Sequence, residues 1–204
     1  MDEKTELLRQ IKEEVINLKG SPLALARVKN EVFPVIGEGN HDADIMFIGE
    51  APGRNEAETG RPFCGAAGRV LDELLLSINV PRKDVYITNI VKDRPPLNRD
   101  PEPEEINVYA PFLDRQVAVI KPKAIATLGR FSMAYVMEKF GLLAELKTIS
   151  VIHGKTFVAE APYGKMSIIP LYHPAVAIYN GNMKKTLIED FKVLLLFISQ
   201  KNDR

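Results

Sequence analysis

Cysteine and net charge are the two features that this sequence lacks most clearly. Cys64 is the single cysteine among 204 residues, so that the chain can form neither an internal disulfide nor a metal site built from several cysteines. The 27 Lys and Arg residues balance 27 Asp and Glu residues, and the formal net charge is zero. Global charge therefore neither supports nor excludes a nucleic-acid partner, and only local clusters of charge bear on that question.

Long apolar runs are also lacking. No run approaches the roughly 20 residues that span a bilayer. The chain opens with Met1, Asp2, Glu3 and Lys4, which begin a charged amphipathic segment rather than a signal peptide. We therefore expect an intracellular, cytoplasmic protein with no membrane partner.

The length and composition are those of an ordinary globular protein. Hydrophobic residues make up 46% of the chain and charged residues 26%. A chain of this length is long enough to bury a sizeable core, and no internal repeat divides it. We expect residues 1–204 to form a single domain.

Apolar spacing predicts strands and helices that alternate along the chain. Helices are predicted at residues 3–18, 65–78, 103–120, 131–140 and 184–199. Strands are predicted at residues 45–48, 85–91, 122–130, 151–155, 157–159 and 166–174, and a loop at residues 20–44. This alternation is typical of a mostly parallel sheet covered by helices, which predicts a three-layer α/β/α fold.

The strand predicted at residues 45–48 ends in a turn rich in Gly and Pro that carries carboxylates. In an open α/β sheet, ligands bind beyond the carboxyl ends of such strands, so Glu50, Ala51 and Glu56 are expected at the mouth of a pocket. Gly49 lets the backbone approach a ligand closely. The alternative is an ordinary strand-to-helix turn with solvated acids, because one Gly-rich turn is a weak signal.

Two further strands end in polar side chains. Asn89 closes the strand at 85–91, with Asn98 beyond it, and His173 closes the strand at 166–174. A single His or Asn is more often structural than catalytic. Because the ends of parallel strands meet at one edge of the sheet, three such ends together predict an active-site pocket.

The loop at residues 92–101 is long, stiffened by proline and basic. Lys92, Arg94 and Arg99 are candidates to contact phosphate groups. The alternative is a solvated surface loop, since runs of charge are usually just exposed.

These motifs together resemble the family 4 uracil-DNA glycosylases. The first block is GEAPG at 49–53 with Glu56, GRPF at 60–63 and GxAG at 65–68. The second is YITN at 86–89 followed by KxRPPxNR at 92–99, and the last is LYHPA at 171–175. The three blocks occur in the family's order, and the resemblance covers residues from about 15 to 191.

The resemblance implies an enzyme that flips a deaminated base out of DNA and cleaves its N-glycosidic bond. Phe63 would stack on the flipped uracil, and the carboxamide of Asn89 would bind its N3–H and O4 edge. His173 would donate a hydrogen bond toward O2 as negative charge grows there. Glu50 and Glu56 would orient the attacking water or stabilise the sugar cation, and the two are not ranked.

The same resemblance implies how DNA would be held. Lys92, Arg94 and Arg99 would contact phosphates, and Asn98 would fix the loop or contact a phosphate or the water. The turn at residues 173–179, which begins with His173 and Pro174 and has Lys184 nearby, would enter the minor groove or hold the backbone. Uracil-containing DNA, single- or double-stranded, is the expected partner, and the protein is expected to act as a monomer.

One departure from the family concerns a cofactor. Family members usually hold a four-iron, four-sulfur cluster on four cysteines, whose thiolates are its ligands. The corresponding positions here are Leu18, Ser21, Asp93 and Tyr109. We therefore predict no cofactor, and we expect packing to hold the segment from Leu18 to Ser21 instead.

Three functions remain open from the sequence. The first is a monofunctional uracil-DNA glycosylase of base excision repair. The second is a related glycosylase for another deaminated base such as hypoxanthine, against which Asn89 stands because its amide suits uracil. The third is a non-catalytic DNA-binding module, which would not need the set of Glu50, Phe63 and His173. The basic linker with an extra histidine that marks covalently trapping relatives is absent, so we expect turnover.

Overall fold

The computed structural model describes residues 2–198, which fold around one sheet of six strands. The strands are β1 (Glu38–Gly39), β2 (Ile45–Gly49), β3 (Tyr86–Asn89), β4 (Ala124–Leu128), β5 (Phe157–Ala161) and β6 (Gly164–Leu171). Their order is β1-β3-β2-β4-β6-β5. The central strands β3, β2, β4 and β6 are parallel, whereas β1 and β5 pair antiparallel at the edges. The mostly parallel sheet predicted from the sequence is confirmed.

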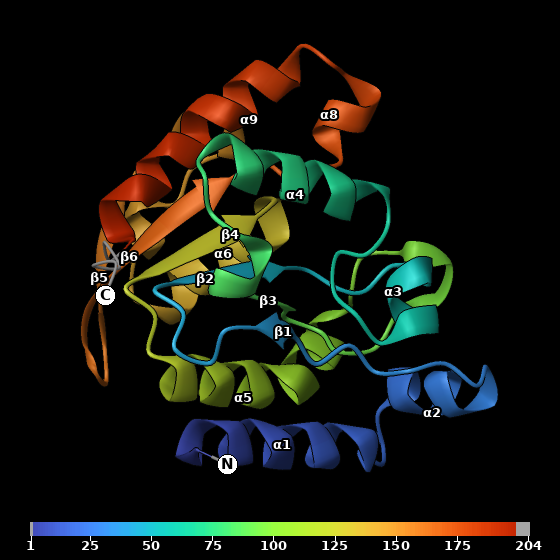
Figure 1. Ribbon diagram of the computed structural model, residues 1–204. Coiled ribbons are helices and arrows are strands. Elements are labelled where there is room, and N and C mark those ends of the chain that lie inside the picture. The colour runs from blue at the N-terminus through green and yellow to red at the C-terminus, as the bar shows by residue number, and fades with distance from the viewer. Residues whose placement is uncertain (1, 199–204) are drawn as a thin grey trace.

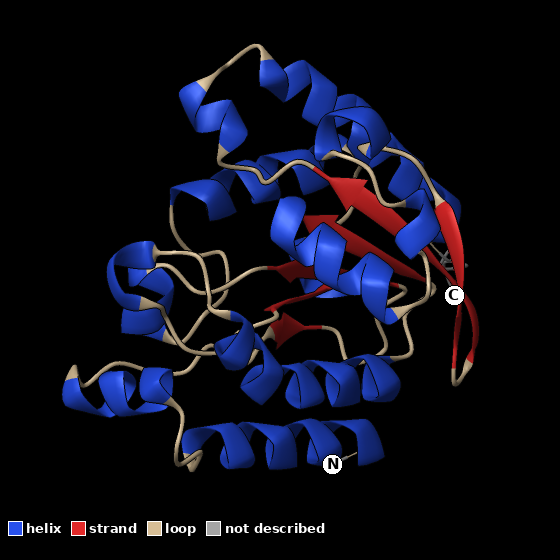
Figure 2. Ribbon diagram, turned by 180° about the vertical axis from the view of Figure 1, so that it is seen from behind, coloured by secondary structure: helices blue, strands red, loops and turns tan. Residues whose placement is uncertain are grey.

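Helices cover both faces of this sheet (Figures 1 and 2). They are α1 (Glu3–Ile16), α2 (Pro22–Lys29), α3 (Arg54–Thr59), α4 (Ala66–Ser77), α5 (Pro103–Ile120), α6 (Arg130–Lys139), α7 (Ile149–Ile152), α8 (Val176–Tyr179) and α9 (Met183–Lys192). Figure 1 shows α4, α8 and α9 above the sheet and α5 below it, with α1 beneath α5. Among the described residues, no helix combines the length and apolar character needed to cross a membrane.

The core is divided by the sheet into two apolar layers. Along β2, Met46 and Ile48 belong to the cluster that includes residues of α1, α5 and α6. Ile45 and Phe47, which alternate with them, belong to the cluster that includes residues of α4 and α9. Successive side chains of a strand point to opposite faces, and β2 is buried on both, which explains its continuous apolar sequence.

Helix α1 adds a partial outer layer to the three-layer fold. It packs against α5, and Arg115 of α5 pairs with Glu14 of α1 at 2.5 Å. Ile11 and Val15 of α1 are buried in the same cluster as α5. The amphipathic pattern predicted at residues 3–18 is therefore confirmed as a helix that ends at Ile16.

Three local predictions were wrong or incomplete. The loop predicted at 20–44 contains both α2 and β1. The hydroxyl of Ser21 caps α2 by accepting a hydrogen bond from the N–H of Ala24 at 3.4 Å. The strand predicted at 151–155 is α7 and the turn after it, although β5 follows as predicted. The last predicted helix is α9 followed by a 3₁₀ segment (Val193–Phe197), and residue 199 lies outside the described residues.

Candidate active site

A cavity of about 320 Å³ lies beyond the carboxyl ends of β2, β3 and β6. Its size falls within the range usual for small-molecule sites. The lining comes from four loops, the end of β3 and the helices α3 and α4: Glu50, Ala51, Pro52, Gly53, Glu56, Phe63, Ala67, Asn89, Pro95, Asn98, Arg99, Asp100 and His173. The convergence of strand ends that the sequence predicts is thus confirmed for Glu50, Asn89 and His173.

Glu50 follows β2 directly and is half-buried in the cavity wall. Burial raises the pKa of its carboxyl to about 7, and the negative charge of Asp100 contributes in the same direction. The positive charge of Arg130 acts in the opposite direction on this pKa. No hydrogen bond to the carboxylate contributes among the described residues. A carboxylate with this pKa is suited to accept a proton near neutral pH.

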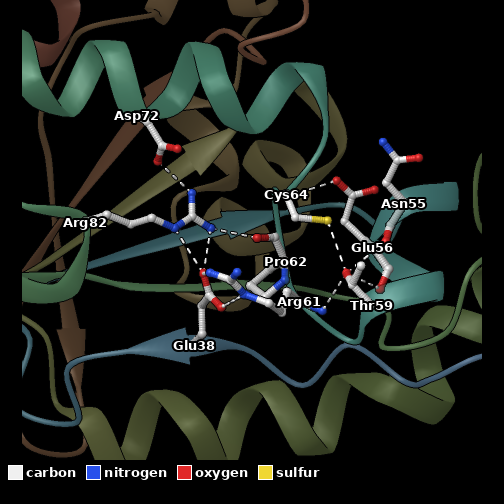
Figure 3. A network of polar contacts seen from close by, with 9 residues as sticks. All are labelled: Glu38, Asn55, Glu56, Thr59, Arg61, Pro62, Cys64, Asp72 and Arg82. Atoms are coloured by element: carbon white, nitrogen blue, oxygen red, sulfur yellow. Dashed lines mark hydrogen bonds and ion pairs between the residues drawn. The ribbon is translucent and has the colours of Figure 1, made fainter.

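Glu56, on α3, is held in a different way. Its Oε1 accepts hydrogen bonds from the backbone N–H groups of Cys64 and Gly65, both at 3.2 Å, and Figure 3 shows the bond from Cys64. Gly65 is the residue before the first turn of α4, so the carboxylate also lies where the helix dipole favours negative charge. The structure therefore distinguishes two carboxylates that the sequence left unranked. Among the described residues, no hydrogen bond contributes to the pKa of Glu50, whereas Glu56 links α3 to the backbone of Cys64 and Gly65.

Phe63 and Asn89 also line the cavity. Both are buried, with exposed fractions of 7% and 2%. A Cβ atom at Gly49 would lie 2.3 Å from Oδ1 of Asn89 and 2.9 Å from the ring of Phe63. Only glycine at position 49 therefore allows these side chains their positions, and the substrate-binding role of Gly49 stays a prediction.

His173 follows β6 and lies beside Phe63, with 5.7 Å between the ring centroids. The backbone N–H of Ala175 donates to Nδ1 of His173 at 3.2 Å. Because a backbone N–H is only a donor, the neutral ring carries its proton on Nε2. Burial lowers the pKa of His173, although the charge of Glu56 partly opposes this. The neutral ring can therefore donate a hydrogen bond from Nε2.

Lys92 lies inside the protein, and the prediction that it contacts DNA phosphates was wrong. Its side chain is fully buried, and its Nζ donates to Oγ1 of Thr88 at 2.8 Å and to the carbonyl of Asn89 at 2.6 Å. A third bond goes to Oε1 of Gln116 on α5 at 2.6 Å. Burial lowers the pKa of Lys92 well below its usual value. The residue holds the end of β3, on which Asn89 stands.

The other basic residues of this loop are partly paired. Nε of Arg94 donates to Oδ1 of Asn98 at 2.7 Å, and Arg99 binds both carboxylate oxygens of Glu105 at 2.9 and 2.6 Å. Arg99 thus anchors the loop to α5. Arg94 and Arg99 stay predictions as phosphate contacts, and Asn98 lies in the cavity wall, where the sequence suggested loop fixation.

Two charged residues near Glu50 were missed by the sequence reasoning. Asp100 lines the cavity two positions after Asn98, and Arg130 at the start of α6 pairs with it at 3.5 Å. Asp100 belongs to the loop already singled out, so its place after Asn98 was a usable signal. Nothing in the sequence connects Arg130 with this loop.

The rim near His173 contains the remaining predicted DNA contacts. Pro174 is buried, so that contact with DNA would have to come from its neighbours. Lys184 is half exposed and pairs with Glu73 of α4 at 2.6 Å. Two residues in the segments after β6 and β3 expose large side chains, namely Tyr179 at the end of α8 (89%) and Leu97 in the basic loop (94%). Leu97 also has a φ of +55°, which is strained for a branched side chain.

The four positions at which the resembling family holds an iron–sulfur cluster contain a hydrogen-bonded network. The hydroxyls of Ser21 and Tyr109 lie 3.1 Å apart, and the phenol of Tyr109 donates to Asp93 at 2.6 Å. Arg27 binds both carboxylate oxygens of Asp93 at 3.0 Å, while Leu18 packs beside the core. The segment is therefore held by a buried ion pair as well as by the expected packing.

These residues do not fit an iron–sulfur cluster, because none of the four supplies a thiolate. Within residues 2–198, no group of three or more His, Cys, Asp or Glu side chains is arranged to hold a metal ion. Arg27 also donates to the carbonyls of Val15 and Ile16 at 3.2 and 2.7 Å, so it caps the end of α1.

Comparisons with known proteins show the family of this chain. The model of the uracil DNA glycosylase superfamily matches residues 36–192. The chain belongs to this superfamily. It is 47% identical to a type-4 uracil-DNA glycosylase of Sulfurisphaera tokodaii over 91% of this chain and 82% of the relative. It is 46% identical to a type-4 enzyme of Saccharolobus solfataricus (82% and 77%) and 45% identical to one of Archaeoglobus fulgidus (82% of each).

The segment matched by the superfamily model contains every residue that lines the cavity. It begins after Leu18 and Ser21 and includes Asp93 and Tyr109.

Proposed function

We propose that the protein is a monofunctional DNA-repair glycosylase that flips uracil out of DNA and hydrolyses its N-glycosidic bond, leaving an abasic site. The observation that carries this proposal is the cavity itself, in which an aromatic ring, a carboxamide, an imidazole Nε2–H and a carboxylate with a pKa of about 7 converge. The names of the type-4 relatives agree with it.

Recognition of uracil would depend on Phe63 and Asn89. The ring of Phe63 offers a stacking face, and stacking of a base on an aromatic ring is worth about 1–3 kcal/mol. The carboxamide of Asn89 offers one acceptor and one donor, which match N3–H and O4 of uracil. Cytosine presents the opposite pattern at this edge, so it would leave both partners unpaired.

Hydrolysis would proceed by attack of water on C1′ of the sugar. The C1′–N1 bond breaks and its electron pair moves onto the uracil ring, where Nε2–H of His173 stabilises the charge that grows on O2. A new bond forms between C1′ and the water oxygen, and Glu50 accepts the water proton. Glu56 contributes by holding the wall of the cavity and by its negative charge near His173.

DNA would lie across the rim between Leu97 and Tyr179. These exposed side chains belong to the segments that follow β3 and β6, whose residues Asn98 and His173 line the cavity. Proteins that extrude or kink bases often insert apolar side chains between base steps. Arg94 would supply positive charge beside Leu97.

The protein would work without an iron–sulfur cluster, with the Arg27–Asp93 pair and the Tyr109–Ser21 bond in its place. Iron and acid-labile sulfide would be measured in protein that is purified without oxygen. Stoichiometric iron and sulfide would contradict this part of the proposal. We further propose that the protein acts as a monomer in the cytoplasm, where it reaches genomic DNA.

The function is tested with matched oligonucleotides that contain U opposite G, U opposite A, single-stranded U, or hypoxanthine opposite T. Abasic sites are detected by cleavage in alkali. We expect cleavage at uracil and, for His173→Ala, a much slower reaction with little change in DNA binding. Cleavage at hypoxanthine alone would show that the pocket accepts another base. DNA binding without cleavage of any substrate would favour a non-catalytic module.

A further inference from the structure

Phe63 is held in a backbone conformation that a phenylalanine seldom adopts. Its φ is +47°, in the left-handed region, although its side chain is large and buried. Such a conformation is strained and persists only where the surrounding structure enforces it. The backbone of Phe63 also passes so close to α4 that a Cβ at Gly68 would lie 1.8 Å from the carbonyl oxygen of Phe63.

Side chains bind the peptide groups on both sides of Phe63, and Figure 3 shows two of these bonds, from Cys64 to Glu56 and from Arg82 to Pro62. On the following side, Glu56 accepts from the N–H groups of Cys64 and Gly65. On the preceding side, Nη2 of Arg82 donates to the carbonyl of Pro62 at 2.7 Å. The strained residue is thus fixed from two directions.

Arg82 is itself rigidly oriented, although it lies outside the cavity. Its Nε and Nη2 bind Oε1 of Glu38 at 3.0 and 2.9 Å, and its Nη1 binds Asp72 of α4 at 2.9 Å. All three guanidinium nitrogens therefore have partners. The side chain is 22% exposed, so that these bonds are partly shielded from water.

We propose that Arg82 is a positioning residue for the base-stacking ring of Phe63. Because the carbonyl of Pro62 is held, the peptide before Phe63 cannot rotate toward the ordinary negative φ. Without Arg82 the backbone at Phe63 relaxes, and the ring of Phe63 moves away from that of His173. The two ring centroids are 5.7 Å apart in the structure. The inference rests on the proposed function in that the ring stacks on a substrate base.

Arg61 provides a matched control within the same network. Its Nε and Nη2 also pair with Glu38, at 2.9 and 3.3 Å. It is more exposed, at 64%, and none of its hydrogen bonds among the described residues goes to the carbonyl of Pro62. A change at Arg61 therefore removes an ion pair to Glu38 while the contact with the Phe63 loop remains.

The test combines Arg82→Met, Arg82→Lys and Arg61→Met with Phe63→Ala in a double-mutant cycle. We expect Arg82→Met to lower kcat/KM on uracil-containing DNA by about 10- to 100-fold, because small misplacements at a reacting centre have effects of this size. Free uracil should inhibit this variant more weakly. Arg82→Lys, which keeps one donor, should restore part of the loss, and Arg61→Met should stay within about twofold of the wild type.

The decisive comparison is the double variant. If Arg82 acts through the ring, then Arg82→Met should have little further effect once Phe63 is Ala. Additive losses, or equal losses for Arg61→Met and Arg82→Met, would overturn the inference. A nuclear Overhauser contact between the rings of Phe63 and His173, present in the wild type and lost in Arg82→Met, tests the positioning without any activity. An inactive wild type would thus refute the proposed function and leave this inference testable.

Discussion

Polar groups on the two sides of the loop after β3 differ in whether their hydrogen bonds are satisfied. Toward α1 and α2, Asp93 is enclosed with Arg27, Tyr109 and Ser21, and each of these side chains has a hydrogen-bond partner. Toward the cavity, Glu50 is half-buried and no hydrogen bond to its carboxylate contributes to its raised pKa. Buried polar groups stabilise a fold only when they are satisfied, whereas a site for chemistry must keep some of them available.

This contrast explains how one segment serves both stability and function. On the side that faces α1 and α2, called the N-terminal side below, hydrogen bonds join residues of α1, α2, α5 and the loop into a single network. Loss of this network should destabilise the packing of these helices. On the cavity side, the carboxylate of Glu50 is half-buried, and this burial disfavours its charged form. Changes on the first side should therefore alter stability, and changes on the second should alter rate and pH dependence.

The largest effect is expected for Asp93→Ala on the N-terminal side. Removal of one partner of a buried ion pair leaves the other charge uncompensated and typically costs about 3–5 kcal/mol. Chemical denaturation would measure the loss in the free energy of unfolding, while uracil excision per folded molecule should change little. Arg115→Ala, which breaks an exposed pair with Glu14, serves as control and should cost less than about 1 kcal/mol. Equal losses for the two variants would contradict the contrast.

A smaller loss is expected for Lys92→Met, at the boundary between the two sides. The change removes the three buried hydrogen bonds that Lys92 donates to Thr88, Asn89 and Gln116, at a cost of about 1–3 kcal/mol. It should also slow uracil excision, because the end of β3 carries Asn89. An exposed lysine, Lys12 of α1, offers the control Lys12→Met, which should alter neither property.

Lys92 also predicts a pH dependence of stability. Burial depresses its pKa in the folded protein, so the unfolded chain binds more protons between that pKa and the ordinary value of 10.5. Stability of the wild type should accordingly rise with pH in this window, up to about 10.5. In Lys92→Met the same increase should be reduced. A parallel pH dependence of the two proteins would contradict the prediction.

The smallest effect, a shift in a pH profile, is expected for Asp100→Asn. In the proposed mechanism Glu50 accepts a proton in its ionised form, so kcat/KM should rise with pH around its pKa of about 7. Burial is the main cause of this raised pKa and Asp100 the second, so the variant should move the rising limb to lower pH by less than about one unit. Arg130→Gln removes a charge that lowers the pKa and should move the limb upward. Shifts of the same sign would contradict the role of these charges.

The sequence predicted the central strands and the pocket because both depend on local patterns. β2 is a continuous apolar run that ends at Gly49, and polar residues follow it directly. The helix at α7 was predicted as a strand because its β-branched residues favour extended structure, whereas only four residues are helical in the fold. A short segment of this kind takes its conformation from its neighbours.

Lys92 shows why a correct site prediction can include a wrong residue. A lysine in a basic loop is usually exposed, and nothing nearby in the sequence indicates burial. Its third acceptor, Gln116, lies 24 positions further along, on α5. The burial of Arg27 likewise depends on a distant residue, because its partner Asp93 is 66 positions away in the chain.

The sequence by itself determined which residues end the central strands, and therefore that Glu50, Asn89 and His173 would share one cavity. It also determined that no four cysteines are present to hold a cluster. Tertiary structure alone decided that Glu50 differs from Glu56, that Lys92 is buried and that Arg82 reaches the loop of Phe63. The physical reason is that these outcomes depend on burial and on hydrogen bonds between segments distant in the chain, which no local pattern encodes.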